Sequence, residues 1–358
     1  MRIFTCFYIL MGFSGTALGQ MKYSTNKSHL FCHDTVNHLD YTFDSGAEIS
    51  SYHYSDSLPE LPWLSPTRIS FALVRDALGN LKLHRKVKAE LYISGLGKIH
   101  KKIVKKEITE PCFNNYLMLG MDVVMNKVVG LYTTNQTINF NAVPPKNLGD
   151  YMVLPMRREW LTKAYYVQLY SGKKRIKCLV DLGYIGAIAF KKPKGLSSQM
   201  LDPYEGWVTT FSAQDVITNF DVYRNQSIKT NETDPAIISD IMVSKNLTLN
   251  LLGLQFFLRY DTVYFDFKNG FIYLKGDNTP PREIPLYNLS FRMGEFIING
   301  ISRNSKEYSH GFRVGEKVNV HGIDISSLSA TDLCNFGRLY WGRLHQLGES
   351  VVFIEKKK

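Results

Sequence analysis

The chain has 358 residues, which exceeds one ordinary domain and predicts two or three. Its residues are 44% hydrophobic, with 21 Tyr and 21 Phe, and short runs of Val, Ile and Thr favour strands over helices. The net charge of +11 is compatible with binding to nucleic acid, with binding to an anionic surface, or with a role in solubility alone. Because the sequence carries no signature of a nucleic-acid-binding fold, we expect no nucleic-acid partner.

The first segment of the chain has the pattern of a secretory leader. Arg2 precedes an apolar stretch, residues 3–18, and the small residues of Ala17-Leu18-Gly19 stand directly before Gln20. We therefore expect residues 1–19 to be a signal peptide and the protein to be exported, to the periplasm or outside the cell. An uncleaved anchor is the alternative, although the apolar run is short for a membrane span.

Four cysteines follow this leader. Cys178 lies in an apolar run and is expected to be a buried free thiol, whereas Cys32 and Cys112 are candidates for a disulfide in the first half. His33 and His38 lie near Cys32, but their spacing matches no zinc pattern. The sequence also lacks a glycine-rich phosphate loop, so we expect neither a metal nor a cofactor.

The first half of the chain begins with an apolar strand that ends in Asp44-Ser45-Gly46 and leads into a second apolar segment. Residues 71–83 follow, and their apolar side chains flank the turn residues Asp76 and Gly79. This pattern predicts a hairpin that overhangs a cleft. In residues 98–106, lysines alternate with Ile and Val, which is typical of an element with one buried and one solvated face.

A second motif, Leu119-Gly120, stands within an apolar run near the end of this half. Residues 128–140 then form a closing strand pair. The proline-containing segment 142–147 is typical of a link between two structural units.

The second half repeats this order of motifs. An apolar strand ends in Asp181-Leu182-Gly183, residues 207–223 are the expected counterpart of the hairpin, and Leu252-Gly253 follows. Gly120 stands 76 positions after Asp44 (120 − 44), and Gly253 stands 72 after Asp181 (253 − 181). Such near-equal spacing indicates gene duplication. Residues 263–275, with Asn-Gly at their centre, predict a closing hairpin.

The C-terminal part of the chain predicts a third, smaller unit. Residues 291–301 form a strand candidate, and 304–322 form a turn-rich run with several glycines. We expect a helix over 328–347 and a last strand over 351–355.

These motifs together resemble the retropepsin-like aspartic protease domain, present twice and followed by a PDZ-like domain. The arrangement is similar to exported proteins of the Bacteroides group. The resemblance implies a mainly β fold with two acid-protease lobes paired as in pepsin and a small α+β PDZ-like domain. The expected boundaries are 21–145 for lobe 1, 146–280 for lobe 2 and 285–358 for the PDZ-like domain.

The resemblance also implies a reaction, the hydrolysis of peptide bonds by water between two carboxyl groups. Asp44 and Asp181 are the residues that this chain offers. Two carboxyl groups a few ångströms apart share one proton, because both cannot be ionised together. Gly46 and Gly183 allow a tight turn after each Asp, and the family pattern includes Gly120 and Gly253 as supporting positions.

In this family a hydroxyl after each catalytic Asp braces the opposite lobe. Ser45 has that hydroxyl, and Leu182 has neither a donor nor an acceptor. Three hypotheses therefore stay open: an active peptidase with both Asp residues in one chain, a peptide-binding or protein-binding scaffold without activity, and a peptidase that pairs first lobes between chains. The expected partners are a peptide or protein substrate and, at the PDZ-like domain, a peptide ligand; that domain is alternatively a packing module.

Overall fold

The structure is a computed structural model of the whole chain. It describes residues 20–24, 30–34, 38–54, 62–75, 81–93, 95–107, 116–160, 162–184, 186–209, 215–276, 284, 286–292 and 294–320, followed by 324, 328–329, 332 and 354–356. The expected leader, the expected turn residues Asp76 and Gly79, and most of the expected helix 328–347 lie outside these residues.

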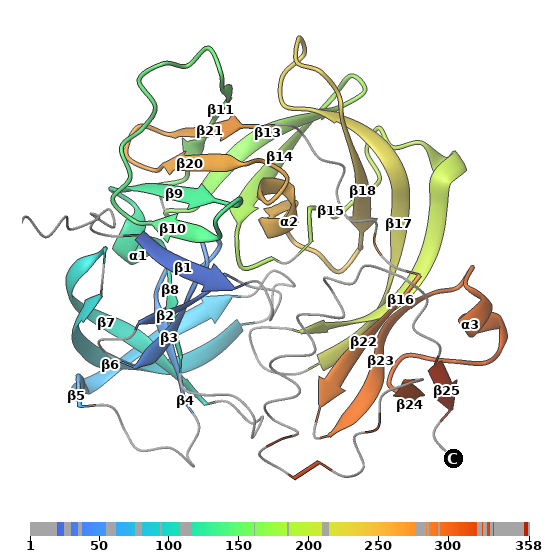
Figure 1. Ribbon diagram of the computed structural model, residues 1–358, viewed down its shortest axis with the longest axis horizontal. Helices are drawn as coiled ribbons and strands as arrows, with labels where there is room; N and C mark the ends of the chain where they lie inside the picture. The colour runs from blue at the N-terminus through green and yellow to red at the C-terminus, as the bar shows by residue number, and fades with distance from the viewer. Residues whose placement is uncertain are drawn as a thin grey trace, which may run out of the picture.

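Lobe 1 is built almost entirely of strands (Figure 1). Its described elements are β1 (Gln20–Ser24), β2 (Phe31–Asp34), β3 (Leu39–Phe43), β4 (Ser51–Tyr54), β5 (Leu64–Arg75), β6 (Leu81–Ile93), β7 (Gly97–Glu107), β8 (Tyr116–Leu119), α1 (Met121–Val124), β9 (Val128–Tyr132) and β10 (Thr137–Asn139).

Lobe 2 has the same character. Its described elements are β11 (Met152–Pro155), β12 (Arg157–Arg158), β13 (Tyr165–Ser171), β14 (Lys174–Asp181), β15 (Ile188–Phe190), the 3₁₀ helix η1 (Ser198–Met200), β16 (Leu201–Thr209), β17 (Asp215–Lys229), β18 (Ile237–Val243), β19 (Leu251–Gly253), α2 (Leu254–Phe257), β20 (Thr262–Asp266) and β21 (Phe271–Lys275).

The two lobes share one strand arrangement around their Asp loops. In lobe 1, β8 lies between β3 and β4, parallel to β3 and antiparallel to β4. In lobe 2, β19 lies between β14 and β15, parallel to β14 and antiparallel to β15. A short helix, α1 or α2, follows the middle strand in each lobe. The Asp loops of the two lobes therefore leave the same type of strand arrangement.

A sheet shared by both lobes joins them. Its strand order is β11-β21-β20-β9-β10-β1, with three strands from each lobe. The seam is the antiparallel pair β9 and β20, in which Val263 faces Leu131 and Tyr264 faces Gly130. Figure 1 shows this sheet crossing from the upper left of the molecule to its centre. The expected mainly β fold with two acid-protease-like lobes is therefore confirmed.

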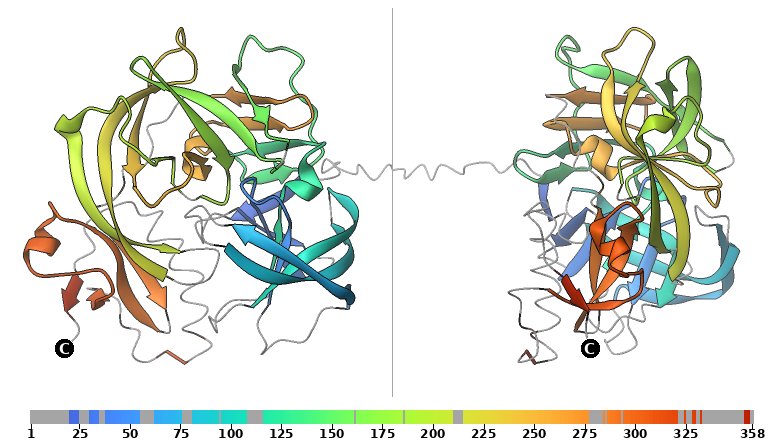
Figure 2. Two further views of the ribbon diagram at one scale, coloured as in Figure 1. Left: turned by 180° about the vertical axis from the view of Figure 1, so that it is seen from behind. Right: turned by 90° about the vertical axis from the view of Figure 1, so that its right-hand side faces the viewer.

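Each lobe also carries a long hairpin. In lobe 1 it is β5 with β6, and Leu73 faces Leu83 across it; in lobe 2 it is β16 with β17, and Trp207 faces Ile217. Both hairpins run from the outside of their lobes toward the middle of the molecule (Figures 1 and 2). These are the hairpins expected from residues 71–83 and 207–223.

The C-terminal unit has a separate hydrophobic core. Its described elements are β22 (Tyr287–Arg292), β23 (Glu295–Ser302), α3 (Lys306–Ser309), β24 (Lys317–Val320) and β25 (Ile354–Lys356). Leu289, Phe296, Ile298 and Val318 are among the side chains that fill this core. The expected strand at 291–301 is part of the β22–β23 hairpin, and the expected last strand is β25, which pairs with β24.

The main core extends through both lobes. Tyr41, Phe43 and Phe265 are almost fully buried in it. Cys178 is a buried free thiol, as expected. The expected pairing of Cys32 with Cys112 is wrong for Cys32, which is a free thiol buried in the core of lobe 1. Burial raises the pKa of the Cys32 thiol to about 12.

None of the helices in the described part of the chain is long and apolar enough to cross a membrane.

Candidate active site

Asp44 lies directly after β3, in a turn that its own carboxylate stabilises. Asp44 Oδ1 accepts hydrogen bonds from the backbone N–H of Gly46 at 2.8 Å and of Ala47 at 3.1 Å. The Asp44 N–H donates to Leu119 O at the end of β8, at 3.0 Å. The neighbouring parallel strand thus fixes where the Asp leaves the sheet.

Asp181 ends β14 and has nearly the same local geometry. Its Oδ1 accepts from the backbone N–H of Gly183 at 3.0 Å and of Tyr184 at 3.1 Å. Asp181 is paired with Gly253 at the end of β19. Each lobe therefore presents one half-buried carboxyl group from the same type of loop.

The two loops meet across the interface between the lobes. A Cβ atom added to Gly46 would lie 2.6 Å from Asp181 Cγ, and a Cβ added to Gly183 would overlap the carboxyl group of Asp44. Each Asp thus lies against the glycine of the opposite motif. The two carboxyl groups therefore share one site. Two carboxyl groups so close together cannot both be ionised, so the pair holds a proton.

The electrostatics of the pair follow from this contact. Burial, then the charge of Asp44 and the hydrogen bond with Asp44, raise the pKa of Asp181 well above its usual value. The hydrogen bonds from the backbone of Tyr184 and Gly183 act in the opposite direction without cancelling the rise. The pair therefore retains one proton at pH values where isolated Asp residues have lost theirs.

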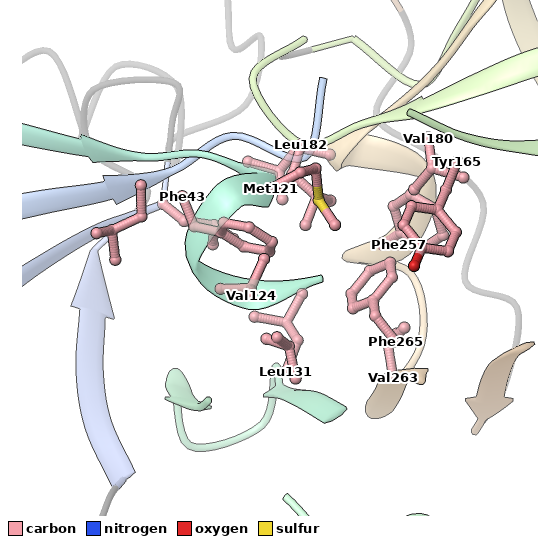
Figure 3. Close-up of a cluster of buried hydrophobic side chains, with 14 of the residues drawn as sticks. Phe43, Met121, Val124, Leu131, Tyr165, Val180, Leu182, Phe257, Val263 and Phe265 are labelled. Carbon is pink, nitrogen blue, oxygen red and sulfur yellow. The ribbon is translucent and has the colours of Figure 1, made fainter. Parts of the chain in front are cut away.

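Ser45 braces the two loops from one side only. Its hydroxyl donates to Val180 O at 2.8 Å and accepts from the Leu182 N–H at 3.0 Å, and both partners belong to lobe 2. Leu182 has the position that corresponds to Ser45 and makes no such bond with its side chain. It is fully buried and belongs to the apolar cluster of Phe43 and Met121 (Figure 3). Apolar packing of Leu182 thus takes the place of the two hydrogen bonds that a hydroxyl at this position would make to lobe 1.

Gly120 and Gly253 support the loops from behind. They have nearly equal backbone angles, φ −100° with ψ −175° and φ −102° with ψ −177°. The N–H groups that follow them bond to the Asp loops: Met121 to Ala47 O and Leu254 to Tyr184 O, each at 2.8 Å. A Cβ on Gly120 would lie 2.8 Å from the backbone of the Asp44 loop, so no other residue fits there without displacing the loop.

Sequence reasoning missed a polar brace in lobe 1. Ser50 Oγ accepts from the Gly120 N–H at 2.9 Å and donates to Asp122 Oδ1 at 2.7 Å. The Ser50 N–H also donates to Asp122 Oδ1. Burial raises the pKa of Asp122. The sequence signal that could have revealed this brace is Asp122, an acidic residue two positions after Gly120. Lobe 2 has Gln255 at the corresponding place.

Sequence reasoning also missed Tyr184, which has the position of Ala47. Its backbone bonds to Asp181 and Leu254, and its ring packs over Gly186 and Gly253. Burial raises the pKa of its hydroxyl. The bulky ring explains why this loop needs a glycine at 186, which has no counterpart in the first motif.

The lobe 1 hairpin has an unusual apolar face. On β6, Val87 and Ala89 point into the core, and the same face continues outward to side chains that are largely exposed. These exposed residues come from both strands and are Phe71, Leu73, Leu81 and Leu83. The two turn residues expected to contact substrate, Asp76 and Gly79, lie between these strands but outside the described residues.

Known proteins resemble this chain only weakly, and only in structure. No protein-family model matches the chain, and no curated protein matches it. Among solved structures, the chain is similar to basic 7S globulin from soybean, with 8% identity, a TM-score of 0.43 and coverage of 74% of this chain and 98% of that one. Conglutin gamma, a basic 7S globulin from lupine seeds, has 9% identity, a TM-score of 0.43 and coverage of 73% and 95%.

A shorter chain is similar as well. A retropepsin-like aspartic protease from Rickettsia conorii has 18% identity and a TM-score of 0.25, and the match covers 35% of this chain and 89% of that one. All three TM-scores lie below 0.5. The assignment of the fold therefore rests on the paired strand arrangements and the shared sheet described above.

Proposed function

We propose that the protein is an aspartic endopeptidase that uses Asp44 and Asp181 with water as the nucleophile. The observation that carries this proposal is the approach of the two carboxyl groups, each against the glycine of the opposite motif and each held in a matching loop. A chance contact between two acidic residues would not repeat the same backbone bonds on both sides. A shared proton in a half-buried site is the arrangement that acid–base hydrolysis needs.

The shared proton gives the pair Asp44 and Asp181 both roles that hydrolysis needs. The carboxyl group that holds the proton donates it to the oxygen of the scissile carbonyl. The ionised carboxyl group accepts a proton from water, and so directs the resulting hydroxide equivalent to the carbonyl carbon. The backbone N–H groups of Gly46 and Ala47 stabilise the Asp44 carboxylate before the reaction begins.

The second candidate is a peptide-binding protein on the same scaffold that does not cleave its ligand. Leu182 favours it, because only one of the two interlobe hydroxyl braces is present. Loss of bracing lets the carboxyl groups move, and small displacements strongly reduce catalysis that depends on positioning.

A peptide library incubated with the purified protein between acidic and neutral pH separates the two candidates. The variants are Asp44→Asn, Asp181→Asn and the double variant. The matched control is Asp150→Asn, because Asp150 is exposed and forms an ion pair with Lys275 at 3.6 Å, outside the two Asp loops. The peptidase hypothesis predicts cleavage by wild type and Asp150→Asn, and loss of at least about 1000-fold in each active-site variant.

Two outcomes would reject the peptidase hypothesis. One is a double variant that cleaves as fast as wild type, which would point to a contaminating peptidase. The other is a wild type that binds library peptides without cleaving any of them, which would support the binding protein.

We further propose that the protein is exported and that its C-terminal unit is PDZ-like and takes a peptide ligand. Export is supported by the leader pattern of residues 1–19. N-terminal sequencing of protein from the native host should begin at Gln20. Isothermal titration of the Asp44→Asn protein with peptides of varied C-terminus tests the ligand.

A further inference from the structure

The C-terminal unit is joined to the lobe 2 hairpin by strand pairing. β23 pairs antiparallel with β16, and Tyr204, Glu205 and Gly206 face Ser302, Ile301 and Gly300. β16 pairs along its other edge with β17, so the C-terminal strand continues the sheet of the hairpin. The paired strands β16 and β23 lie at the lower right of Figure 1 and can be followed from behind in Figure 2.

A cluster of buried charges lies beside this pairing. Arg224 on β17 binds Asp202 on β16 at 2.7 Å and Asp240 on β18 at 2.8 Å. The side chains of Arg224, Asp202 and Asp240 are 17%, 9% and 6% exposed. An ion pair that is so little exposed holds a fixed geometry, because removal of one partner leaves an uncompensated buried charge.

The same charges are bound by the C-terminal unit and the segment before it. Ser302 Oγ donates to Asp202 Oδ1, and Asn304 Nδ2 donates to the same oxygen at 3.2 Å. The Ile284 N–H donates to Asp240 Oδ2 at 3.1 Å, and Arg224 Nη1 donates to Ile284 O. Each carboxylate therefore has partners in lobe 2 and beyond it.

Arg224 also lies where the hairpin bends. The register of β17 against β18 shifts between Tyr223 and Gln226, and Asn225 has a φ of +48°. Asp240 Oδ1 accepts from the Asn225 N–H at 3.0 Å, which holds this irregular residue in place. A bulge bends the strand that contains it, so the contacts of Asp240 set the direction in which the hairpin leaves the lobe.

A second, more exposed contact reaches further along the hairpin. Arg303 binds Glu205 on β16 with Nη2 at 3.0 Å and donates to Asn219 on β17 at 2.8 Å. The hydroxyl of Tyr308 donates to Glu205 as well, at 3.3 Å. The C-terminal unit thus contacts both strands of the hairpin.

We infer that Arg303 and Ser302 are positioning residues of the proposed peptidase, through which the C-terminal unit holds the lobe 2 hairpin in place for substrate. This inference rests on the proposed function, because β16 and β17 run toward the middle of the molecule, where a substrate of the two Asp residues would bind (Figures 1 and 2). It assigns the C-terminal unit a part in substrate binding that is separate from any ligand of its own.

The test compares Arg303→Ala, Ser302→Ala and Lys317→Ala in the full-length protein. Arg303 is half-exposed, so its loss should not prevent folding. Lys317 is the matched control, because it is a half-exposed cation of the same unit whose ion pair goes to Glu295 within that unit, at 2.6 Å. We expect KM for a cleaved library peptide to rise about fivefold in Arg303→Ala and in Ser302→Ala, with kcat within about twofold of wild type.

Hydrogen exchange of the β16 and β17 amides is measured on the same proteins without substrate. Exchange should accelerate in Arg303→Ala and Ser302→Ala and stay unchanged in Lys317→Ala. Unchanged exchange in both test variants overturns the inference, even if the protein proves to have no peptidase activity. Faster exchange with an unchanged KM overturns it as well, because the hairpin would then be tied to the C-terminal unit without affecting substrate.

Discussion

Gly46 and Gly183 each face the carboxyl group of the opposite lobe, and this contact limits what either position can hold. A methyl group at residue 183 would overlap the carboxyl group of Asp44. A methyl group at 46 would lie 2.6 Å from Asp181 Cγ. Neither glycine has a positive φ, so the backbone conformation does not require glycine there. Glycine is needed at both positions because a side chain would collide with the carboxyl group of the opposite lobe.

Gly183→Ala should therefore separate the carboxyl groups and reduce kcat by about 100-fold or more, because catalysis depends on their distance. Gly149→Ala is the control, since an added Cβ there meets only Asn147 at an ordinary distance of 3.4 Å. Initial rates on one peptide substrate measure both. A Gly183→Ala protein with wild-type activity would show that the two loops are not in contact.

Leu182 is the residue at which this chain departs from a symmetric site. Leu182→Thr supplies the missing hydroxyl and should raise kcat, while the loss of buried apolar volume should cost about 1–3 kcal/mol of stability. Steady-state kinetics and urea unfolding measure the two effects. An unchanged or lower kcat in a folded variant would show that packing of Leu182 already fixes the loop.

At the scale of elements, the parts that follow local rules could be predicted. The Asp and Leu-Gly motifs indicated β3, β8, β14 and β19, because apolar runs that end in glycine are local signals. The hairpin β20–β21 followed from its Asn-Gly turn. Neither the seam between β9 and β20 nor the pairing of β16 with β23 could be predicted, because partners so distant in sequence leave no local pattern.

The same distinction applies to the site. Asp44, Asp181 and their glycines were identifiable because they repeat. The Ser50–Asp122 brace was not, because it occurs in one lobe only. Tyr184 was not identified either, since nothing in an Asp-Leu-Gly-Tyr run indicates that the ring packs over the following loop.

Ser45 tests the contact between elements of different lobes. Ser45→Ala removes the bonds to Val180 O and to the Leu182 N–H, both buried, and should cost about 1–3 kcal/mol of stability. Thermal unfolding measures the loss. Ser309→Ala is the control, because the Ser309 hydroxyl is exposed and bonds only to Lys306 O of its own helix. Equal unfolding temperatures for the two variants would show that the Ser45 hydroxyl does not stabilise the contact between the lobes.

At the scale of the whole molecule, the carboxyl pair links folding stability to pH. In the native state the pKa of Asp181 is raised above 3.8, its ordinary value and the value expected in the unfolded chain. At a pH between the unfolded and the native pKa, the native state therefore holds a proton that the unfolded chain has released. The stability contributed by this proton is complete below the unfolded pKa. It is lost as the pH rises through the native pKa.

Asp181→Asn should remove the loss of folding stability that accompanies rising pH, because asparagine stays neutral at every pH. The variant should match wild type near pH 3 and exceed its stability at neutral pH, by about 1.4 kcal/mol for each pH unit between the two pKa values. Denaturant unfolding across this range measures the difference. A constant difference at all pH values would mean that Asp181 has an ordinary pKa.

The titration of Asp181 itself, followed by carboxyl ¹³C NMR in wild type and in Asp44→Asn, tests the shared proton without any substrate. In wild type, Asp181 should keep its proton well above the ordinary Asp range. In Asp44→Asn its pKa should fall while staying above 3.8, because burial remains and the charge of Asp44 is gone. Two carboxyl groups that both titrate near 3.8 in wild type, or an Asp181 whose titration does not respond to Asp44→Asn, would contradict the dyad.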